Sequence, residues 1–399
     1  MAMLDLKLAV LRTDPGRRRL LRSLKDCFTI ATANLLQQRI RFVVAVAGTA
    51  MPILLLLLQL ALVQAVRKEV TLLYRSFDFN LVLVPVTYEY MFSGGVFDRL
   101  RLAQARAVEG VADSFSLNVN GGAWTGQDMR RSPILVIGVD DKPQFIADPQ
   151  IRDGIASLKT GNQVLVDRFS SASLGSLAPG QTAKLDDRQV TIAGQFSLGM
   201  FFYASGAAII RNANLSQLIG DSSGNVSLGL IATNPGYDPE TVRRELMQAL
   251  PPDVRVLSRS ELLDEEQRFF LSTKPLGVMV EVGMIVAFLA GAVMLWQVLS
   301  AEIMRRLGEF ATLGAMGYGA SFILGVGFCE TFLLGLAAFL PAAVIGGVIL
   351  EGLELATHLP SWPDLGLWLE LLAIVLLMCT LCGVSVAQRI ARAQPASLF

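Results

Sequence analysis

The stretch that decides the fold is RRLGEFATLGAMGYGASF, residues 305–322. It lies between two apolar runs that are each long enough to cross a membrane, yet it has the spacing of a helix rather than of a simple turn. One helical face of the segment from Ala301 to Met316 is apolar and carries Ile303, Leu307, Phe310, Ala311 and Gly314. We therefore predict that the apolar run before it continues past the membrane as a helix.

Charged residues occupy most of the opposite face of this helix. Glu302 with Arg306, and Arg305 with Glu309, are i,i+4 pairs of opposite charge, which support a helix. The glycines at 314, 317 and 319 then let the chain turn back toward the bilayer. The result is a helical finger with an apolar stripe, and that stripe must be buried, either on the lipid surface or in a groove of a partner.

The composition is that of a membrane protein with a large soluble part. Of the 399 residues, 53% are apolar and only 17% are charged, against roughly 25% charged in ordinary soluble domains. The formal net charge is zero, which gives no indication of a nucleic-acid partner. We identify no catalytic residue and no metal site in the sequence. Cys379 and Cys382 form a C-x-x-C inside an apolar run, and we interpret them as packing residues. His358, the only histidine, is expected to be exposed.

Four apolar stretches divide the chain, which we predict to be an α/β membrane protein with four transmembrane helices. A basic N-terminal segment, 1–41, precedes the first helix, 42–66, and a large α/β segment, 67–275, follows it. The rest of the chain is predicted to consist of a second helix at 276–300, a cytoplasmic coupling loop at 301–319, a third helix at 320–350 that Pro341 could kink, a short loop at 351–364, a fourth helix at 365–387 and a tail at 388–399.

Lysine and arginine in the short flanks set the expected orientation. The N-terminal segment, the 301–319 loop and the tail carry such residues, whereas the 351–364 loop carries none. We therefore place both termini and the coupling loop in the cytoplasm, and 67–275 and 351–364 on the outer side of the membrane. Residues 17–36 repeat apolar positions at helical spacing, which indicates an amphipathic helix, either on the inner leaflet or packed on protein.

The segment 67–275 reads as strands and helices, and we predict that it has two lobes. Strands are expected at NLVLVPV (80–86), SPILVIGVD (132–140), NQVLVD (162–167), RQVTIAGQF (188–196) and, after a turn, in PGQTAKL (179–185). Helices are expected at 97–108 and at 238–250, the latter with Asp238 as N-cap. A helical pattern is also present in SRSELLDEEQRFFLSTK (258–274), so we predict a continuous helical lever from 260 to 316. The charges within it do not all favour a helix, because Glu261 and Glu265 repel each other while Asp264 and Arg268 attract each other.

Three glutamates lie within the predicted spans, where a carboxylate is costly and usually faces a bundle interior or an interface. Glu281 and Glu370 are near the outer ends of their helices, where we expect them to reach water. Glu330 is about 15 Å inside the third span at about 1.5 Å per residue, and we expect it to bind a polar group of a dimer partner rather than to relay protons.

GEFATLGAMGYGASFILGVGFCET (308–331) resembles the signature of DevC-type permeases, within the MacB/FtsX superfamily of ABC transporters. The matching residues are Glu309, Phe310, Ala311, Thr312, Leu313, Ala315, Met316, Gly317, Tyr318 and Glu330. Gly314 departs from the pattern, because a basic residue is usual there. The stretches 77–84, 229–262 and 392–399 resemble the corresponding parts of the family in the same order.

The resemblance implies a permease that dimerises and recruits two copies of a separate ATPase. Its ATPase-coupling residues would be Glu302, Arg306, Glu309, Phe310, Thr312, Leu313, Met316, Gly317 and Tyr318. No lysine directly follows a glycine in this chain, so a G-x-x-x-x-G-K-[ST] phosphate-binding loop is absent from the sequence. We therefore expect a non-catalytic subunit that binds no cofactor of its own, with ATP and Mg bound to the partner ATPase. The resemblance further implies mechanotransmission to a periplasmic adaptor and a TolC-like channel, for efflux of a lipid, glycolipid or other amphipathic substrate.

Three other functions fit the same sequence features. The first is an FtsX-like regulator of a periplasmic hydrolase, which the size of the outer segment disfavours. The second is lipoprotein extraction, as in the LolC/LolE branch of the superfamily. The third is a membrane sensor, which would need neither an ATPase nor an apolar cytoplasmic finger.

Overall fold

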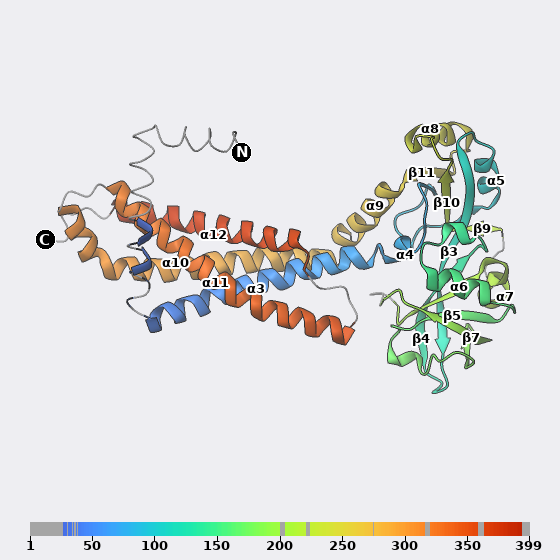
Figure 1. The fold of residues 1–399 in the computed structure, drawn as a ribbon, viewed down its shortest axis with the longest axis horizontal. Helices are drawn as coiled ribbons and strands as arrows, with labels where there is room; N and C mark the ends of the chain where they lie inside the picture. The colour runs from blue at the N-terminus through green and yellow to red at the C-terminus, as the bar shows by residue number, and fades with distance from the viewer. Residues whose placement is uncertain are drawn as a thin grey trace, which may run out of the picture. The chain divides into compact units, whose positions relative to one another are not determined.

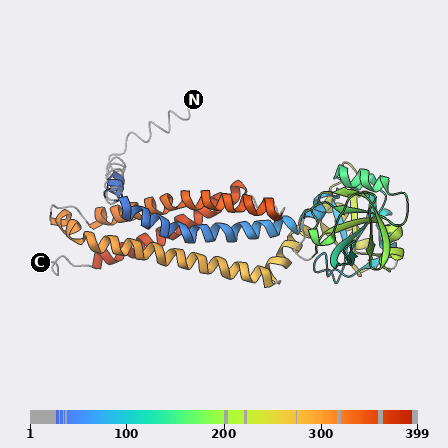
Figure 2. The ribbon, with the colours of Figure 1, turned by 90° about the horizontal axis from the view of Figure 1, so that it is seen from below.

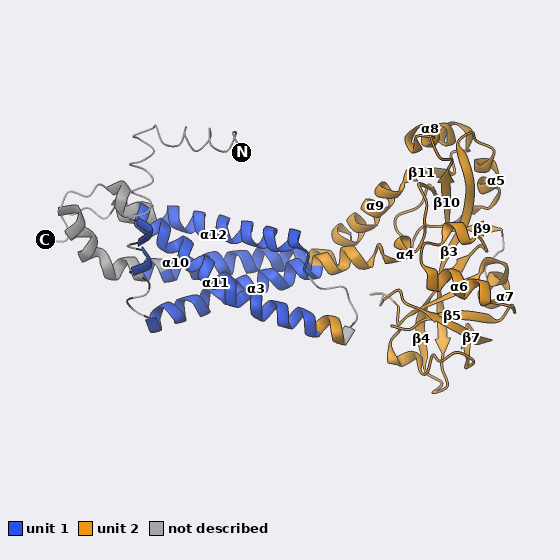
Figure 3. Ribbon diagram, viewed as in Figure 1, with its two compact units in different colours: residues 1–62, 279–352, 362–399 blue, residues 63–278, 353–361 orange. Residues whose placement is uncertain are grey.

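The computed structural model describes residues 27–29, 31–33, 35, 37, 39–199, 204–220, 224–273, 275–315, 320–357 and 363–392. Within these ranges it leaves the side chains of 275, 276, 299, 302–315, 320–324, 356, 357 and 386–392 undescribed. The chain forms two compact units. One comprises residues 1–62, 279–352 and 362–399, and the other comprises 63–278 and 353–361 (Figure 3).

Four long helices form the first unit and lie side by side in both ribbon views (Figures 1 and 2). They are α3 (Arg39–Glu69), α10 (Pro275–Ala315), α11 (Ala320–Thr357) and α12 (Leu365–Arg392). Each contains a stretch long and apolar enough to cross a membrane. The four apolar helices predicted from the sequence are therefore confirmed, and α11 continues through Pro341.

Small residues allow the four helices to pack closely. A Cβ atom at Gly335 of α11 would lie 2.2 Å from Cys379 Sγ, and one at Gly346 would lie 2.3 Å from Leu57 of α3. Membrane helices associate through such close contacts, because the hydrophobic effect contributes little to helix association inside a lipid bilayer. Cys379 and Cys382 are both buried and unlinked, and Cys382 Sγ donates to the carbonyl of Ala292 at 3.3 Å. This agrees with their interpretation as packing residues.

The predicted amphipathic helix at 17–36 lies mainly outside the described residues. Of its described positions, Cys27 and Ala31 are 2% and 0% exposed. A Cβ atom added at Gly325 of α11 would lie 3.2 Å from Cys27 Sγ. Cys27 and Ala31 are therefore packed on protein, whereas Phe28 of the predicted apolar face is 49% exposed.

The second unit is built on a nine-stranded sheet in the order β11-β1-β10-β3-β4-β8-β5-β7-β6. Its strands are β1 (Leu81–Pro85), β3 (Val111–Thr125), β4 (Arg131–Val139), β5 (Gln163–Asp167), β6 (Thr182–Leu185), β7 (Arg188–Phe196), β8 (Ala207–Arg211), β10 (Leu228–Thr233) and β11 (Val254–Ser258). A separate pair joins β2 (Phe97–Asp98) to β9 (Asn225–Val226). Its helices are α4 (Leu72–Arg75), α5 (Leu100–Arg106), α6 (Pro149–Ser157), α7 (Leu215–Ile219), α8 (Pro239–Ala249) and α9 (Arg259–Ser272).

The long strand β3 belongs to two differently shaped halves of this sheet. Its first part pairs with β10 in an open half, which α5 and α8 accompany (Figure 1). Its last residues, Trp124 and Thr125, also pair with β6, so that β3, β4, β8, β5, β7 and β6 close on themselves. Figure 2 views the unit from the side on which β4 and β7 lie in Figure 1. The sequence predicted two lobes; the structure has two halves that share β3 within one compact unit.

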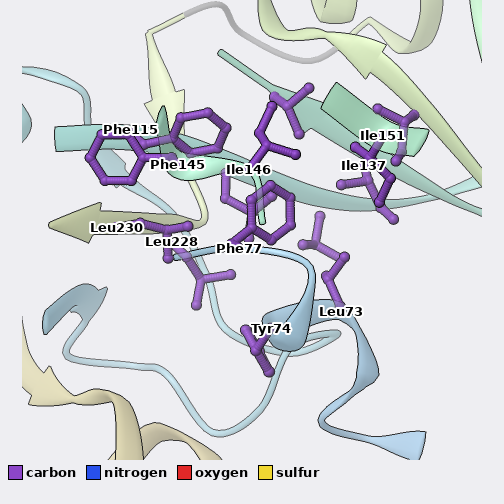
Figure 4. Close-up of a cluster of buried hydrophobic side chains, with 14 of the residues drawn as sticks. Leu73, Tyr74, Phe77, Phe115, Ile137, Phe145, Ile146, Ile151, Leu228 and Leu230 are labelled. Carbon is purple, nitrogen blue, oxygen red and sulfur yellow. The ribbon is translucent and has the colours of Figure 1, made fainter. Parts of the chain in front are cut away.

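The sheet has a hydrophobic core on each face, which explains its uninterrupted apolar strands. In β1, Leu81 and Leu83 face the core shared with α5 and α8, whereas Val82 and Val84 face the core that contains α6. That second core is centred on aromatic rings: Phe115 lies 5.6 Å from Phe77 and 5.3 Å from Phe145, centroid to centroid (Figure 4). A third core fills the closed half around Trp124.

The expected strands at 80–86, 132–140, 162–167, 179–185 and 188–196 correspond to β1, β4, β5, β6 and β7. The helix expected at 238–250 is α8, and Asp238 caps it by accepting a hydrogen bond from the Thr241 N–H at 3.1 Å. The expected helix at 97–108 is shorter than predicted, because residues 97–98 form β2 and α5 covers only Leu100–Arg106.

Candidate functional site

The helix α10 is the element that could connect the two sides of a membrane. It runs without interruption from Pro275 to Ala315, which is 41 residues. Its apolar window ends at Val298. At about 1.5 Å per residue the helix is about 60 Å long, roughly twice the thickness of the hydrocarbon core. The segment 299–315 therefore extends the helix beyond its apolar part, in agreement with the prediction for the second span.

The predicted ATPase-coupling residues lie on this extension or just after it. Glu302, Arg306, Glu309, Phe310, Thr312 and Leu313 belong to the helical backbone of α10, but their side chains lie outside the described part of the structure. Met316, Gly317 and Tyr318, like the unrelated His358, lie outside the described residues altogether. Their role therefore stays a prediction.

The three glutamates in the apolar helices differ in burial. Glu330 of α11 is 1% exposed, and its neighbour Thr331, which donates to the Gly327 carbonyl at 2.8 Å, is fully buried. Glu281 of α10 and Glu370 of α12 are exposed. The structure thus places Glu330, alone of the three, inside the packed helices.

At the other end of α10, the first turn of helix α9 fixes it to the nine-stranded sheet and its helices, which we call the sheet domain. Ser258 accepts the Glu261 N–H at 3.2 Å while the Glu261 carboxylate accepts the Ser258 N–H at 2.8 Å, which is a complete capping box. Glu261 also pairs with Arg243 of α8, and Glu265 pairs with Arg255 of β11, each at 3.1 Å. The two glutamates that repel each other in the sequence are therefore each neutralised by a different neighbouring element.

The loop at 86–96, which follows β1, covers one side of α9. The Tyr90 ring stacks on Phe269 with centroids 4.3 Å apart and meets Phe270 edge-on at 5.5 Å. Arg255 donates to the Tyr88 carbonyl at 3.2 Å from the neighbouring strand. These contacts hold the last turns of α9 against the loop, because aromatic pairs in these geometries each contribute about 0.5–1.5 kcal/mol beyond their burial.

A buried carboxyl group lies at the centre of this junction. Glu266 of α9 is 0% exposed, and its Oε1 accepts hydrogen bonds from Tyr74 OH of α4, at 2.7 Å, and from Tyr88 OH of the loop. Burial raises the pKa of Glu266 to about 7, although the hydrogen bonds from Tyr88 and Tyr74 act in the opposite direction. Burial likewise raises the pKa values of both tyrosines, and the Glu266 charge adds to this.

The helix α4 brings Tyr74 to this point from the core of the sheet domain. Leu73, Tyr74 and Phe77 are all fully buried, and Figure 4 shows them in the hydrophobic cluster with Phe115 and Phe145. The chain that leaves α3 is therefore anchored in the core within a few residues. Glu266 joins this segment to α9, the helix that leads into α10.

Sequence reasoning missed Glu266, although a signal was present. Leu262, Glu266 and Phe270 are spaced four residues apart, so they share one face of α9, and all three are buried. A glutamate in the middle of an apolar stripe needs a hydrogen-bonding partner. The partners could not be identified from the pattern, because Tyr74 and Tyr88 are 192 and 178 residues away.

The predicted continuous lever from 260 to 316 is wrong in one respect. The helix α9 ends at Ser272 and α10 begins at Pro275, so the lever consists of two helices. Pro275 lacks an N–H group and disfavours helical geometry in the residue before it, which explains the break. A Cβ atom at Gly277 would lie 2.0 Å from the Leu271 carbonyl oxygen, so the start of α10 passes directly against the end of α9.

Comparison with known proteins finds a family model that matches the C-terminal part of the chain. Residues 282–395 match the family model described as FtsX-like permease C-terminal. A search of curated proteins found no match.

Among solved structures, the extracellular domain of the noncanonic ABC-type transporter YknZ from Gram-positive bacteria is similar, with 12% identity and a TM-score of 0.33 over 45% of this chain and 98% of that one. The periplasmic region of MacB from Actinobacillus actinomycetemcomitans has 9% identity and a TM-score of 0.35, over 50% and 96%. A domain of a putative permease protein from Porphyromonas gingivalis has 12% identity and a TM-score of 0.33, over 51% and 99%. The similarity to the FtsX-like permease C-terminal family thus covers residues 282–395, from the first turns of α10 through α12.

Proposed function

We propose that this chain is the membrane subunit of an ATP-driven tripartite efflux pump that works by mechanotransmission. Two copies of the chain would form a dimer in the bacterial inner membrane, with both termini in the cytoplasm, and each would bind one separate ATPase subunit. The sheet domain would engage a periplasmic adaptor that leads to a TolC-like outer-membrane channel. The substrate would be a lipid, glycolipid or other amphipathic molecule.

The observation that carries this proposal is the length and continuity of α10. One unbroken helix of 41 residues holds both an apolar membrane window and the extension with the E-F-A-T-L motif. Because each backbone hydrogen bond links residues four apart, a push on the extension is passed along the helix axis. The helix begins against α9, which is fixed to the sheet domain by its capping box and ion pairs.

The apolar face of the extension gives the expected contact with the ATPase. We expect Phe310→Asp and Leu313→Asp to release the ATPase, because both are predicted ATPase-coupling residues and each change would place a charge in a buried contact. The measurement is co-purification of this chain with its candidate ATPase in lipid nanodiscs, followed by ATP turnover. The wild type should retain a hydrolysing ATPase, and either variant should reduce the bound ATPase at least tenfold.

The matched control is Met247→Asp, which makes the same kind of change on the exposed face of α8 in the sheet domain. It should retain the ATPase at the wild-type level. Retention by the Phe310 and Leu313 variants, or failure of the wild type to bind any ATPase, would contradict the proposed docking. The second result would favour a sensor or a regulator without an ATPase.

A further inference from the structure

Three oxygen atoms from three different segments meet in the buried junction of the sheet domain. Tyr74 OH of α4 lies 2.7 Å from Glu266 Oε1 of α9 and 3.0 Å from Tyr88 OH of the 86–96 loop, and Tyr88 OH also contacts Glu266 Oε1. Tyr74 and Glu266 are 0% exposed and Tyr88 is 5% exposed. Each oxygen therefore contacts both of the others, out of reach of bulk water.

The number of protons decides whether all three contacts can be hydrogen bonds. Each tyrosine hydroxyl has one proton to donate, and an ionised carboxylate has none. With Glu266 ionised, both hydroxyls donate to Oε1, and the contact between Tyr74 and Tyr88 is left without a proton. With Glu266 protonated, three protons serve three contacts and the ring of hydrogen bonds is complete.

The second oxygen of Glu266 also fits the protonated form better. Glu266 Oε2 is buried and has no hydrogen-bond partner of ordinary geometry among the described residues, although the backbone of Met91 faces the carboxyl group. An ionised carboxylate would place part of its charge on this oxygen, where only the Met91 backbone offsets it, which is costly in a buried site. A neutral carboxyl would leave only an unpaired carbonyl there.

We propose that Glu266, Tyr74 and Tyr88 form a proton-dependent latch, in which protonated Glu266 holds α9 on α4 and the 86–96 loop, and loss of the proton loosens α9. The latch lies entirely within the sheet domain. It is therefore independent of whether an ATPase drives α10. It makes the strength with which α9 is held against α4 and the 86–96 loop depend on the pH outside the membrane.

The direction of the pH effect follows from the pKa of Glu266. In the closed junction this pKa is about 7, against an ordinary value of 4.5, so the closed junction binds the proton more tightly than the opened one. The latch is strongest at low pH and weakens as the pH rises through about 7. Three other charged groups lie close to the latch. Glu265 of α9 adds to the rise of the Glu266 pKa and is paired with Arg255 of β11. Arg259 donates to the Tyr74 carbonyl at 3.2 Å, and Glu89, beside Tyr88, is exposed.

The test is hydrogen exchange of the α9 amides in the full chain, in lipid nanodiscs without nucleotide, at pH 6 and pH 8. Each rate is divided by the intrinsic rate at its pH to give a protection factor. For a group with a pKa of about 7 in the closed state and an ordinary pKa in the open state, proton linkage predicts a fall of about tenfold in protection between these pH values.

Glu266→Gln cannot ionise, so its protection factors should be the same at both pH values. Asp264→Asn, which changes an exposed carboxylate of the same helix, should retain the tenfold fall. An infrared titration of the wild type provides a second measurement, in which a protonated-carboxyl band should disappear with a midpoint near pH 7 and should be absent from Glu266→Gln. Wild-type protection that does not change with pH, or a tenfold fall retained in Glu266→Gln, would overturn the latch. So would a wild-type spectrum without such a band, even if the glutamine variant failed to fold.

Discussion

Replacing Trp124 with alanine is expected to lower the free energy of unfolding of the sheet domain by about 3–5 kcal/mol. Trp124 is 0% exposed and lies in the core of the closed half, where the end of β3 pairs with β6. Its Nε1–H donates to the Leu174 carbonyl at 3.2 Å. The change therefore leaves a large cavity and an unpaired buried carbonyl at the pairing that closes the sheet.

The matched control is Tyr237→Ala, which removes an aromatic ring from the surface of the same domain. Tyr237 is 44% exposed and its hydroxyl donates to Glu109 at 2.9 Å. Surface changes of this kind usually alter stability by less than about 1 kcal/mol. Pulse proteolysis of the full chain across a urea series measures both variants. Equal midpoints for the two would show that Trp124 does not stabilise the closed half.

The second large effect is expected at the corner between α9 and α10. In an ordinary helix, replacing glycine with alanine stabilises by about 0.5–1 kcal/mol. At Gly277 the added Cβ would lie 2.0 Å from the backbone oxygen of Leu271, so the corner must open. We expect Gly277→Ala to destabilise the corner by about 1–3 kcal/mol, the usual range for overpacking.

Hydrogen exchange at the end of α9 and the start of α10 measures this effect. Since about 1.4 kcal/mol corresponds to a factor of ten, exchange there should be roughly five- to a hundredfold faster in Gly277→Ala. Gly347→Ala is the control, because a Cβ atom at Gly347 of α11 meets nothing within 4 Å. Unchanged exchange in both variants would mean that the corner tolerates a side chain and is not tightly packed.

The sequence predicted the elements whose pattern is local. The four apolar helices follow from hydropathy, and β1, β4 and β5 follow from runs of residues that are apolar because both faces of the sheet are covered. The cap of α8 follows from Asp238 and Pro239. In each case the decisive residues are neighbours along the chain.

The strand β3 was missed because its signals are not local. It is the longest strand, yet it contains Ser114, Ser116 and Asn118, which read as exposed, and two consecutive glycines. In the structure these polar residues are buried, and Asn118 donates to Asn212 Oδ1 at 3.0 Å and accepts the Ser227 N–H at 2.9 Å. The partners of Asn118 are about a hundred residues away, and no periodic pattern reveals such partners.

The break in the lever was missed for a related reason. The pattern of 258–274 is helical and passes into an apolar run, so one lever was expected, although Pro275 was visible in the sequence. Proline is well tolerated in the first turn of a helix, and here it begins α10 rather than interrupting it. The close contact of Gly277 with Leu271 depends on the path of the backbone, which the sequence does not reveal.

We propose above all that α10 carries motion from a cytoplasmic ATPase to the sheet domain. Its most direct test is hydrogen exchange of α9 in the nanodisc complex with the ATPase, with and without Mg and a non-hydrolysable ATP analogue. Arg305→Pro breaks the extension of α10, at a cost of about 3 kcal/mol to the helix, and Arg305→Ala keeps it helical. The account predicts that the nucleotide changes α9 protection in the wild type and in Arg305→Ala but not in Arg305→Pro. No response in the wild type, or the same response in Arg305→Pro, would contradict it.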